Sequence, residues 1–130
     1  MEKVEKRRNV RLPVTLTGQL SGGRLKARTV ETRNLSLTGA RLDLVPLESD
    51  VEGDCILTLF LPTDEMRCVS VRCRTNYSDG ASCGLAFLSI DQHDFALLSD
   101  YLESEIDDPA VIRREIKQGH VPMMESWAVL

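Results

Sequence analysis

The sequence opens with a cluster of arginines whose chemistry suits a phosphorylated ligand. Arg7, Arg8 and Arg11 lie just before the first run of alternating apolar residues. A guanidinium group binds phosphate oxygens in a bidentate manner, pairs with guanine O6 and N7, and stacks on a ring face. Arg7 and Arg11 are four residues apart, so we expect their side chains to converge on one object held against the folded domain. Cations near a terminus are also common in solvated tails, and the cluster alone leaves both interpretations open.

A second polar stretch, "NLSLTG" at residues 34–39, supplies hydrogen-bonding groups. Asn34 and Ser36 are two residues apart, so on an extended backbone their side chains share one face while the intervening leucines point to the other. Asparagine and serine offer donors and acceptors for a base edge or a sugar. Gly39 permits either a positive φ or a close approach to the backbone. A turn that uses Asn, Ser and Gly is the plainer interpretation of this hexapeptide taken alone.

The charge of the chain is unevenly distributed and favours a small anionic partner. The whole chain has a net charge of −4, yet residues 1–41 carry +7 and residues 42–130 carry −11. A protein that binds a nucleic-acid duplex usually has a positive field over the whole domain. A barrel that binds single strands needs an aromatic stacking platform, and aromatic residues make up only 5% of this chain. We therefore expect no nucleic-acid partner.

Apolar residues alternate with polar ones over most of the first ninety residues, which predicts β-strands. The six expected strands are residues 12–20, 25–34, 38–44, 54–62, 67–77 and 81–89. The short links between them favour antiparallel neighbours, and an antiparallel sheet of this size removes its exposed edges most simply by closing. We predict an all-β domain, a six-stranded antiparallel β-barrel. A chain of 130 residues fits one such domain.

The periodicity changes at Asp91, where apolar residues begin to recur at intervals of three and four. This pattern predicts an amphipathic helix over residues 91–106, capped by Ser89 or Asp91, with its apolar face on the barrel.

A shorter helix is expected to follow, over residues 109–118. Asp108 would cap it, Pro109 would take the first helical position, and Gly119 would end it. The remaining residues, 120–130, are apolar but irregular, and could dock on the domain, pair with another copy, or fray.

The two polar stretches together resemble a known family. "RRNVR" at residues 7–11, followed about two dozen residues later by "NLSLTG", is similar to the paired RxxxR and (D/N)xSxxG signature of PilZ domains, the bacterial receptors for cyclic di-GMP. Either motif is common by chance, whereas both in this order and at these places in the strand pattern are far more specific. "CGLAFLSI" and the acidic helix after it resemble the last strand and closing helix of the family. The resemblance covers roughly residues 5–104.

The resemblance implies a barrel whose arginine segment folds over a ligand on its surface. Arg7 and Arg11 would contact the phosphates and guanine faces of cyclic di-GMP, and Arg8 would add a phosphate contact. The family binds one ligand or an intercalated pair, and the residue before RxxxR is thought to influence which. Here that residue is Lys6, which could accept a second phosphate but lacks the stacking plane of arginine, so both stoichiometries stay open.

The second motif completes the implied binding site, and no catalytic site is expected. By the same resemblance, Asn34 and Ser36 would contact a guanine and Gly39 would leave room for it. His93 and His120 lie in or after the helical region, and no serine or cysteine has a visible base nearby in the sequence. We expect the protein not to be an enzyme.

The cysteines and the N-terminus indicate a reducing compartment without a metal site. The four cysteines contain no C-x-x-C pair, lie in strand-like runs, and are Cys55, Cys68, Cys73 and Cys83. We expect them to act as small apolar residues rather than zinc ligands. The N-terminus has no apolar segment after its charges, and no run approaches the about 18 apolar residues of a membrane span. We therefore expect a cytoplasmic protein with no membrane partner.

These observations predict a flexible arginine-rich segment at 1–11, a PilZ-like barrel with its closing helix at 12–106, and a C-terminal extension at 107–130. The predicted function is a cytoplasmic receptor or effector that binds cyclic di-GMP, orders its N-terminal segment over the ligand and signals through a partner protein, with no further cofactor. The alternative is a PilZ-like interaction adaptor with little or no nucleotide binding, acting through the acidic helix and the tail. The downstream partner and the oligomeric state stay open.

Overall fold

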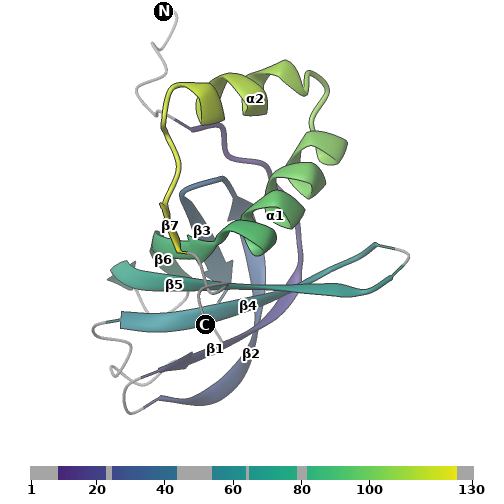
Figure 1. The fold of residues 1–130 in the computed structure, drawn as a ribbon. Helices are drawn as coiled ribbons and strands as arrows, with labels where there is room; N and C mark the ends of the chain where they lie inside the picture. Colours follow the sequence, from purple (N-terminus) through teal and green to yellow (C-terminus); the bar gives the residue numbers. More distant parts are fainter. Residues whose placement is uncertain (1–8, 23–24, 44–53, 64, 79–81, 126–130) are drawn as a thin grey trace, which may run out of the picture.

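The structure, a computed structural model, describes residues 9–22, 25–43, 54–63, 65–78 and 82–125. Its strands are β1 (Thr17–Gly22), β2 (Leu25–Leu35), β3 (Gly39–Asp43), β4 (Asp54–Leu61), β5 (Arg67–Ser78), β6 (Ser82–Asp91) and β7 (Met123–Glu125), and its helices are α1 (Gln92–Glu105) and α2 (Ala110–Lys117). The sheet order is β3-β2-β1-β4-β5-β6-β7, and an additional β3–β6 pairing joins the first six strands into a ring. All contacts within this ring are antiparallel. The predicted six-stranded barrel is thus confirmed (Figure 1).

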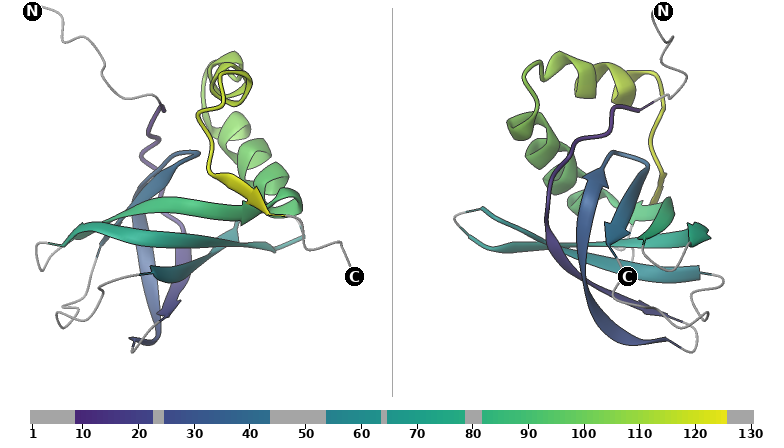
Figure 2. Two further views of the ribbon diagram at one scale, coloured as in Figure 1. Left: turned by 60° about the vertical axis from the view of Figure 1, so that its left-hand side comes forward. Right: turned by 180° about the vertical axis from the view of Figure 1, so that it is seen from behind.

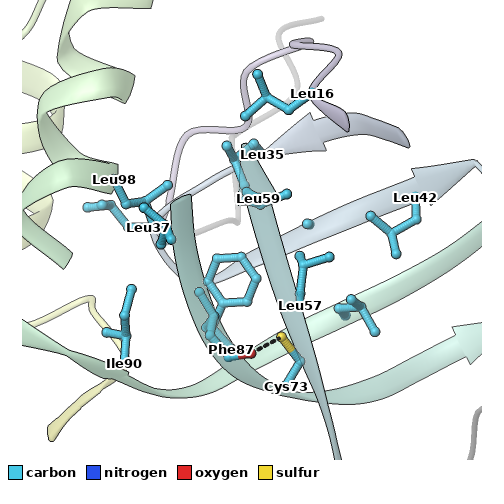
Figure 3. Packing of buried hydrophobic residues seen from close by; sticks show 14 of the residues in the cluster. Leu16, Leu35, Leu37, Leu42, Leu57, Leu59, Cys73, Phe87, Ile90 and Leu98 are labelled. Atoms are coloured by element: carbon cyan, nitrogen blue, oxygen red, sulfur yellow. Dashed lines mark hydrogen bonds between the residues drawn. The ribbon is translucent and has the colours of Figure 1, made fainter. Parts of the chain in front are cut away.

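Alternating side chains from every strand of the barrel fill its interior. In β4, for example, Leu57 and Leu59 are fully buried, whereas the intervening positions are half-buried or exposed. Figure 3 shows Leu35, Leu42 and Phe87 from other strands converging on the same core. Each buried side chain of this size contributes about 1.5–3 kcal/mol relative to an exposed one. This core holds the strands in register, and the register decides which outward-facing residues meet.

The first strand begins later than predicted, at Thr17 rather than residue 12. The Thr32 hydroxyl accepts a hydrogen bond from the Leu16 N–H (2.8 Å) and donates one to the Val14 carbonyl (2.7 Å), so a side chain occupies the place of the backbone ladder. The chain before β1 still contacts β2, because Leu12 forms an isolated antiparallel bridge with Leu35.

Helix α1 covers one end of the barrel (Figures 1 and 2). Of the two caps considered, Asp91 is the one observed, since its Oδ1 accepts from the His93 N–H at 3.0 Å. Phe95, Leu98 and Leu102 are buried on the inner face of the helix, as the three-and-four spacing predicts.

Helix α2 forms where a second helix was expected and starts one residue later, at Ala110. Asp108 Oδ1 accepts from the Ala110 N–H at 3.1 Å, which is a capping contact. Gly119, at φ +77°, follows the end of the helix in the left-handed region that glycine adopts without strain. The inward-facing Ile112 is fully buried in the core.

The described part of the tail docks on the barrel. Strand β7 pairs in parallel with β6, with Met123 opposite Ser89 and Glu125 opposite Asp91. Parallel neighbours need a long crossover connection, and α1 and α2 together provide it. Glu125 also accepts a hydrogen bond from Arg72 on β5, with Oε1 3.2 Å from Nη1. Among the described residues, no helix is long and apolar enough to cross a membrane.

Candidate functional site

Four of the six residues expected to bind a ligand line one surface pocket. They are Arg11, Asn34, Ser36 and Gly39, and the pocket has a volume of about 480 Å³. The remaining two, Arg7 and Arg8, lie outside the described residues. The complete described lining comes from the N-terminal segment, strand β2, the β2–β3 connection and strands β3, β5 and β6. It comprises Asn9, Arg11, Asn34, Leu35, Ser36, Thr38, Gly39, Ala40, Arg41, Asn76, Gly84, Leu85, Ala86 and Phe87.

The Leu12–Leu35 bridge places Arg11 at the pocket. The Leu12 N–H donates to the Leu35 carbonyl at 2.8 Å, and the Leu35 N–H donates back to the Leu12 carbonyl at 2.9 Å. Because the bridge is antiparallel, the residue before Leu12 lies across from the residue after Leu35, so Arg11 faces Ser36. The bridge thereby fixes the backbone next to Arg11, and the Arg11 side chain is exposed.

Ser36 builds the turn between β2 and β3. Its N–H donates to the Gly39 carbonyl at 2.9 Å, and its hydroxyl accepts from the Thr38 N–H at 3.2 Å and donates to the Gly39 carbonyl at 3.3 Å. Ser36 is only 4% exposed, and the leucines on either side of it are fully buried. The turn interpretation of this hexapeptide therefore holds, and the same residues line the pocket. Their contact with a ligand stays a prediction.

Gly39 is required by the approach of a neighbouring strand. A Cβ at this position would lie 2.5 Å from the Leu85 carbonyl oxygen of β6. Gly39 is not among the described glycines with positive φ. Of the two reasons considered for a glycine here, the close approach applies, and what approaches is the backbone of the chain itself.

Arg41 is a pocket residue that the sequence reasoning did not identify. It pairs with Asn34 across β2–β3, so the two side chains share the outer face of the barrel. Its Nη2 donates to Ser82 Oγ at 3.3 Å, while its Nε is buried and has no hydrogen-bond partner among the described residues. Only the strand register reveals this neighbourhood, because a bulge between Thr32 and Asn34 shifts the pairing. A buried donor without a partner is costly unless a ligand or water satisfies it.

The pocket is electropositive over its described lining. Its charged side chains there are Arg11 and Arg41, and the other lining residues are neutral. Asn9 and Thr38 add polar groups and are joined to each other, with Thr38 Oγ1 donating to Asn9 Oδ1 at 2.8 Å. The volume falls within the about 300–1,000 Å³ usual for small-molecule sites. Such a lining suits an anion that also has hydrogen-bonding edges.

The cysteines do not contribute to the site. Burial raises the pKa of Cys55 to about 11, and burial also raises the pKa values of Cys73 and Cys83. These thiols stay protonated at neutral pH and are poor nucleophiles. Within the described ranges, no group of three or more His, Cys, Asp or Glu side chains is arranged to hold a metal ion.

Comparison with known proteins establishes the family. A sequence model of the PilZ domain matches residues 5–104, and the chain belongs to the PilZ domain family. PilZ domains are a family of cyclic di-GMP receptors and generally act as receptor or effector modules rather than as enzymes. No curated protein sequence gives a significant match.

Solved structures share the fold at low sequence identity. The inhibitor of motility (MotI/DgrA) of Bacillus subtilis is 19% identical with a TM-score of 0.62, and the match covers 90% of this chain and 54% of that one. The present chain therefore spans about half the length of the Bacillus protein. The PilZ domain of CeSA from a cellulose-synthesizing bacterium is 17% identical with a TM-score of 0.58, covering 75% of this chain and 99% of that one.

Proposed function

We propose that this protein is a cytoplasmic receptor for cyclic di-GMP. The observation that carries the proposal is the convergence of Arg11, Asn34, Ser36 and Gly39 on one pocket whose described charged side chains are all positive. These residues come from the N-terminal segment, the end of β2, the β2–β3 turn and the start of β3. They match both halves of the signature of the family to which the chain belongs.

Each described residue offers chemistry that the ligand can use. The Arg11 guanidinium binds phosphate oxygens or stacks on a guanine, and the Asn34 amide complements a guanine edge. The Ser36 hydroxyl donates its proton to the Gly39 carbonyl and accepts one hydrogen bond from the Thr38 N–H. Its second lone pair remains available for a guanine N–H. Gly39 lets β6 approach β3 and so shapes the floor of the pocket beside them.

Arg7 and Arg8 complete the proposed site, with Arg7 on phosphate and guanine and Arg8 on phosphate. Residues 1–11 hold five cations and two acids, and a ligand with two phosphates offsets their mutual repulsion. Binding then orders this segment over the pocket and creates a surface that a partner protein recognises. Cleavage by trypsin after Arg7 and Arg8 should slow at saturating ligand, and an unchanged cleavage rate would contradict the ordering.

The binding test is calorimetric titration of the full chain with cyclic di-GMP, with GTP as the control nucleotide. Arg11→Ala should weaken binding about tenfold or more, because a charge-assisted contact to phosphate is lost. Arg67→Ala is the matched control, since Arg67 lies on β5, pairs with Glu65 and is not among the pocket residues. The molar ratio at saturation decides between one ligand and an intercalated pair, the point that Lys6 leaves open.

Two results would contradict the proposal. The first is the absence of binding by the unaltered protein in calorimetry and in a second method. The second is an equal loss of affinity in the Arg11 and Arg67 variants, which would indicate attraction by net charge rather than a site.

A further inference from the structure

Helix α2 presents a buried carboxylate to the N-terminal segment. Glu115 is only 5% exposed. Its Oε1 accepts a hydrogen bond from Asn9 Nδ2 at 2.8 Å, and its Oε2 accepts from the Val10 N–H at 2.9 Å. Asn9 Nδ2 also donates to the His120 carbonyl at 2.8 Å, just beyond the end of the helix. Figure 1 shows the beginning of the described chain beside the C-terminal end of α2.

The same asparagine reaches the turn of the binding motif. Asn9 Oδ1 accepts from Thr38 Oγ1 at 2.8 Å, and both Asn9 and Thr38 line the pocket. A continuous set of hydrogen bonds therefore runs from Glu115 through Asn9 to the β2–β3 turn. Asn9 lies two residues before Arg11, so this set holds the backbone from which the Arg11 side chain extends.

The amphipathic pattern of α2 does not account for an acid at this position. Glu115 lies three residues after Ile112, on the inward face of the helix where Ile112 is fully buried. A buried carboxylate is costly unless its oxygens are hydrogen-bonded. Both oxygens of Glu115 accept hydrogen bonds from donors of the N-terminal segment. These contacts offset the cost of burying the carboxylate.

We propose that Glu115 is a positioning residue for the ligand pocket, acting through Asn9 and Val10, and that docking of α2 and occupation of the pocket are thereby coupled. The proposal rests on the cyclic di-GMP function proposed above. In the structure Arg11 already lines the pocket while the Glu115 contacts are formed, so these contacts hold the binding-competent arrangement. Losing them lowers the fraction of molecules in that arrangement, and the apparent affinity falls by the same fraction. By linkage, the ligand must stabilise the contacts in return.

The first test is titration of Glu115→Gln with cyclic di-GMP beside the unaltered full chain. Glutamine keeps the size of the side chain but replaces one acceptor oxygen with an NH₂ group. One of the two N–H donors, from Asn9 or Val10, then faces another donor. We expect an affinity loss on the order of tenfold, within the range of ordinary coupling energies. Glu103→Gln is the matched control. Glu103 contacts Arg113 of α2 at 3.5 Å from α1, so its loss alters a helix contact without touching the N-terminal segment, and it should leave affinity unchanged.

Hydrogen exchange distinguishes the positioning role of Glu115 from a purely structural one, because only the positioning role links α2 protection to the ligand. Without ligand, Glu115→Gln should speed exchange of the Val10 amide while the barrel amides keep their protection. With saturating cyclic di-GMP, the unaltered protein should gain protection across residues 110–117, and the variant should not. In an Asn9→Ala background, Glu115→Gln should cost much less affinity than it does alone, because the two residues act as one unit.

The outcomes separate this inference from the function on which it rests. No binding by the unaltered protein would overturn both. Normal binding by the unaltered protein with equal or tighter binding by Glu115→Gln would overturn only the positioning role. Equal losses in the Glu115 and Glu103 variants, or α2 protection that persists in Glu115→Gln, would overturn the coupling.

Discussion

Some residues that line the candidate pocket also stabilise the barrel itself. Ser36 closes the β2–β3 turn, and Gly39 allows β6 to approach β3. Arg41 differs from them, since its Nε has no hydrogen-bond partner in the part of the chain that the structure describes. Replacing Ser36 or Gly39 should therefore affect both stability and binding. Replacing Arg41 should mainly affect binding.

Arg41→Met should weaken cyclic di-GMP binding about tenfold while leaving stability nearly unchanged. Methionine keeps much of the aliphatic stem but removes the charge and the donors that a phosphate or guanine could use. The measurement is calorimetric affinity together with the denaturation midpoint. Arg33→Met is the control, because Arg33 lies on neighbouring β2, pairs with Asp43 and is not a pocket residue. Unchanged affinity in Arg41→Met would exclude Arg41 from the site.

Gly39→Ala should reduce both stability and ligand affinity. The new Cβ would lie 2.5 Å from a backbone oxygen of β6, and relieving such an overlap costs about 1–3 kcal/mol. Gly18→Ala is a matched control, since its Cβ would also lie 2.5 Å from a backbone oxygen, that of Thr58, and Gly18 is not a pocket residue. Denaturant titration should show similar losses for both variants, and calorimetry at a temperature where both are folded should show an affinity loss for Gly39→Ala alone.

The sequence reveals some residues of the site and conceals others for a physical reason. Arg11 and Asn34 belong to short motifs whose spacing is visible along the chain. Arg41 becomes their neighbour only through the β2–β3 register. The Asn9–Glu115 contact joins positions 106 residues apart, and no local pattern encodes such a contact.

At the scale of elements, the patterns that arise from local chemistry predicted the fold well. Period-two alternation located all six barrel strands, and Asp91 and Asp108 act at the helix starts as expected. Two features were not predicted. The start of β1 depends on the Thr32 hydroxyl, which replaces ladder bonds. Strand β7 forms because the chain leaves α2 next to β6. The short apolar run of β7 does not by itself predict that position.

The central strands should lose stability at alkaline pH through their buried thiols. Burial raises the pKa of Cys55 from 9.0 to about 11, and it raises the pKa values of Cys73 and Cys83 in the same direction. Between pH 9 and 11 the unfolded chain releases protons that the folded chain keeps. The stabilisation is therefore complete below pH 9 and is lost as pH rises, by about 1.4 kcal/mol per pH unit for Cys55. Cys73 and Cys83 add a fall of the same sign. Denaturant titrations from pH 7 to 10.5 would measure this slope.

Two cysteine variants test whether buried thiols cause this decline of stability with pH. Cys55→Ala removes a buried thiol of β4 and should flatten the decline, whereas Cys68→Ala removes an exposed thiol of β5. Burial also raises the pKa of Tyr101, which adds a fall of the same sign at the upper end of the range. Stability that stays constant to pH 10.5, or equal slopes in the two variants, would contradict this account.

At the scale of the whole molecule, the first described residues of the chain contact helix α2 beside the candidate pocket. Asn9 and Val10, at the start of the described chain, contact α2, and the chain after α2 returns through β7 to the barrel (Figure 2). Asn9 and Val10 belong to the basic first third of the chain, with its net charge of +7. They are thus held by a helix that lies beyond the family match at residues 5–104. An anionic ligand that contacts Arg11 would therefore also stabilise the contacts between this segment and α2.

Cyclic di-GMP should therefore raise the melting temperature of the protein. A ligand that binds only the folded state adds about 2.7 kcal/mol of stability at a hundred times its dissociation constant, which corresponds to a shift on the order of 10 °C for a domain of this size. GTP at the same concentration should have little effect. The shift should shrink as salt is raised, because phosphate contacts at an exposed pocket are screened. Calorimetric binding without any thermal shift would mean that the ligand binds folded and unfolded chains alike, and the pocket would then not be its site.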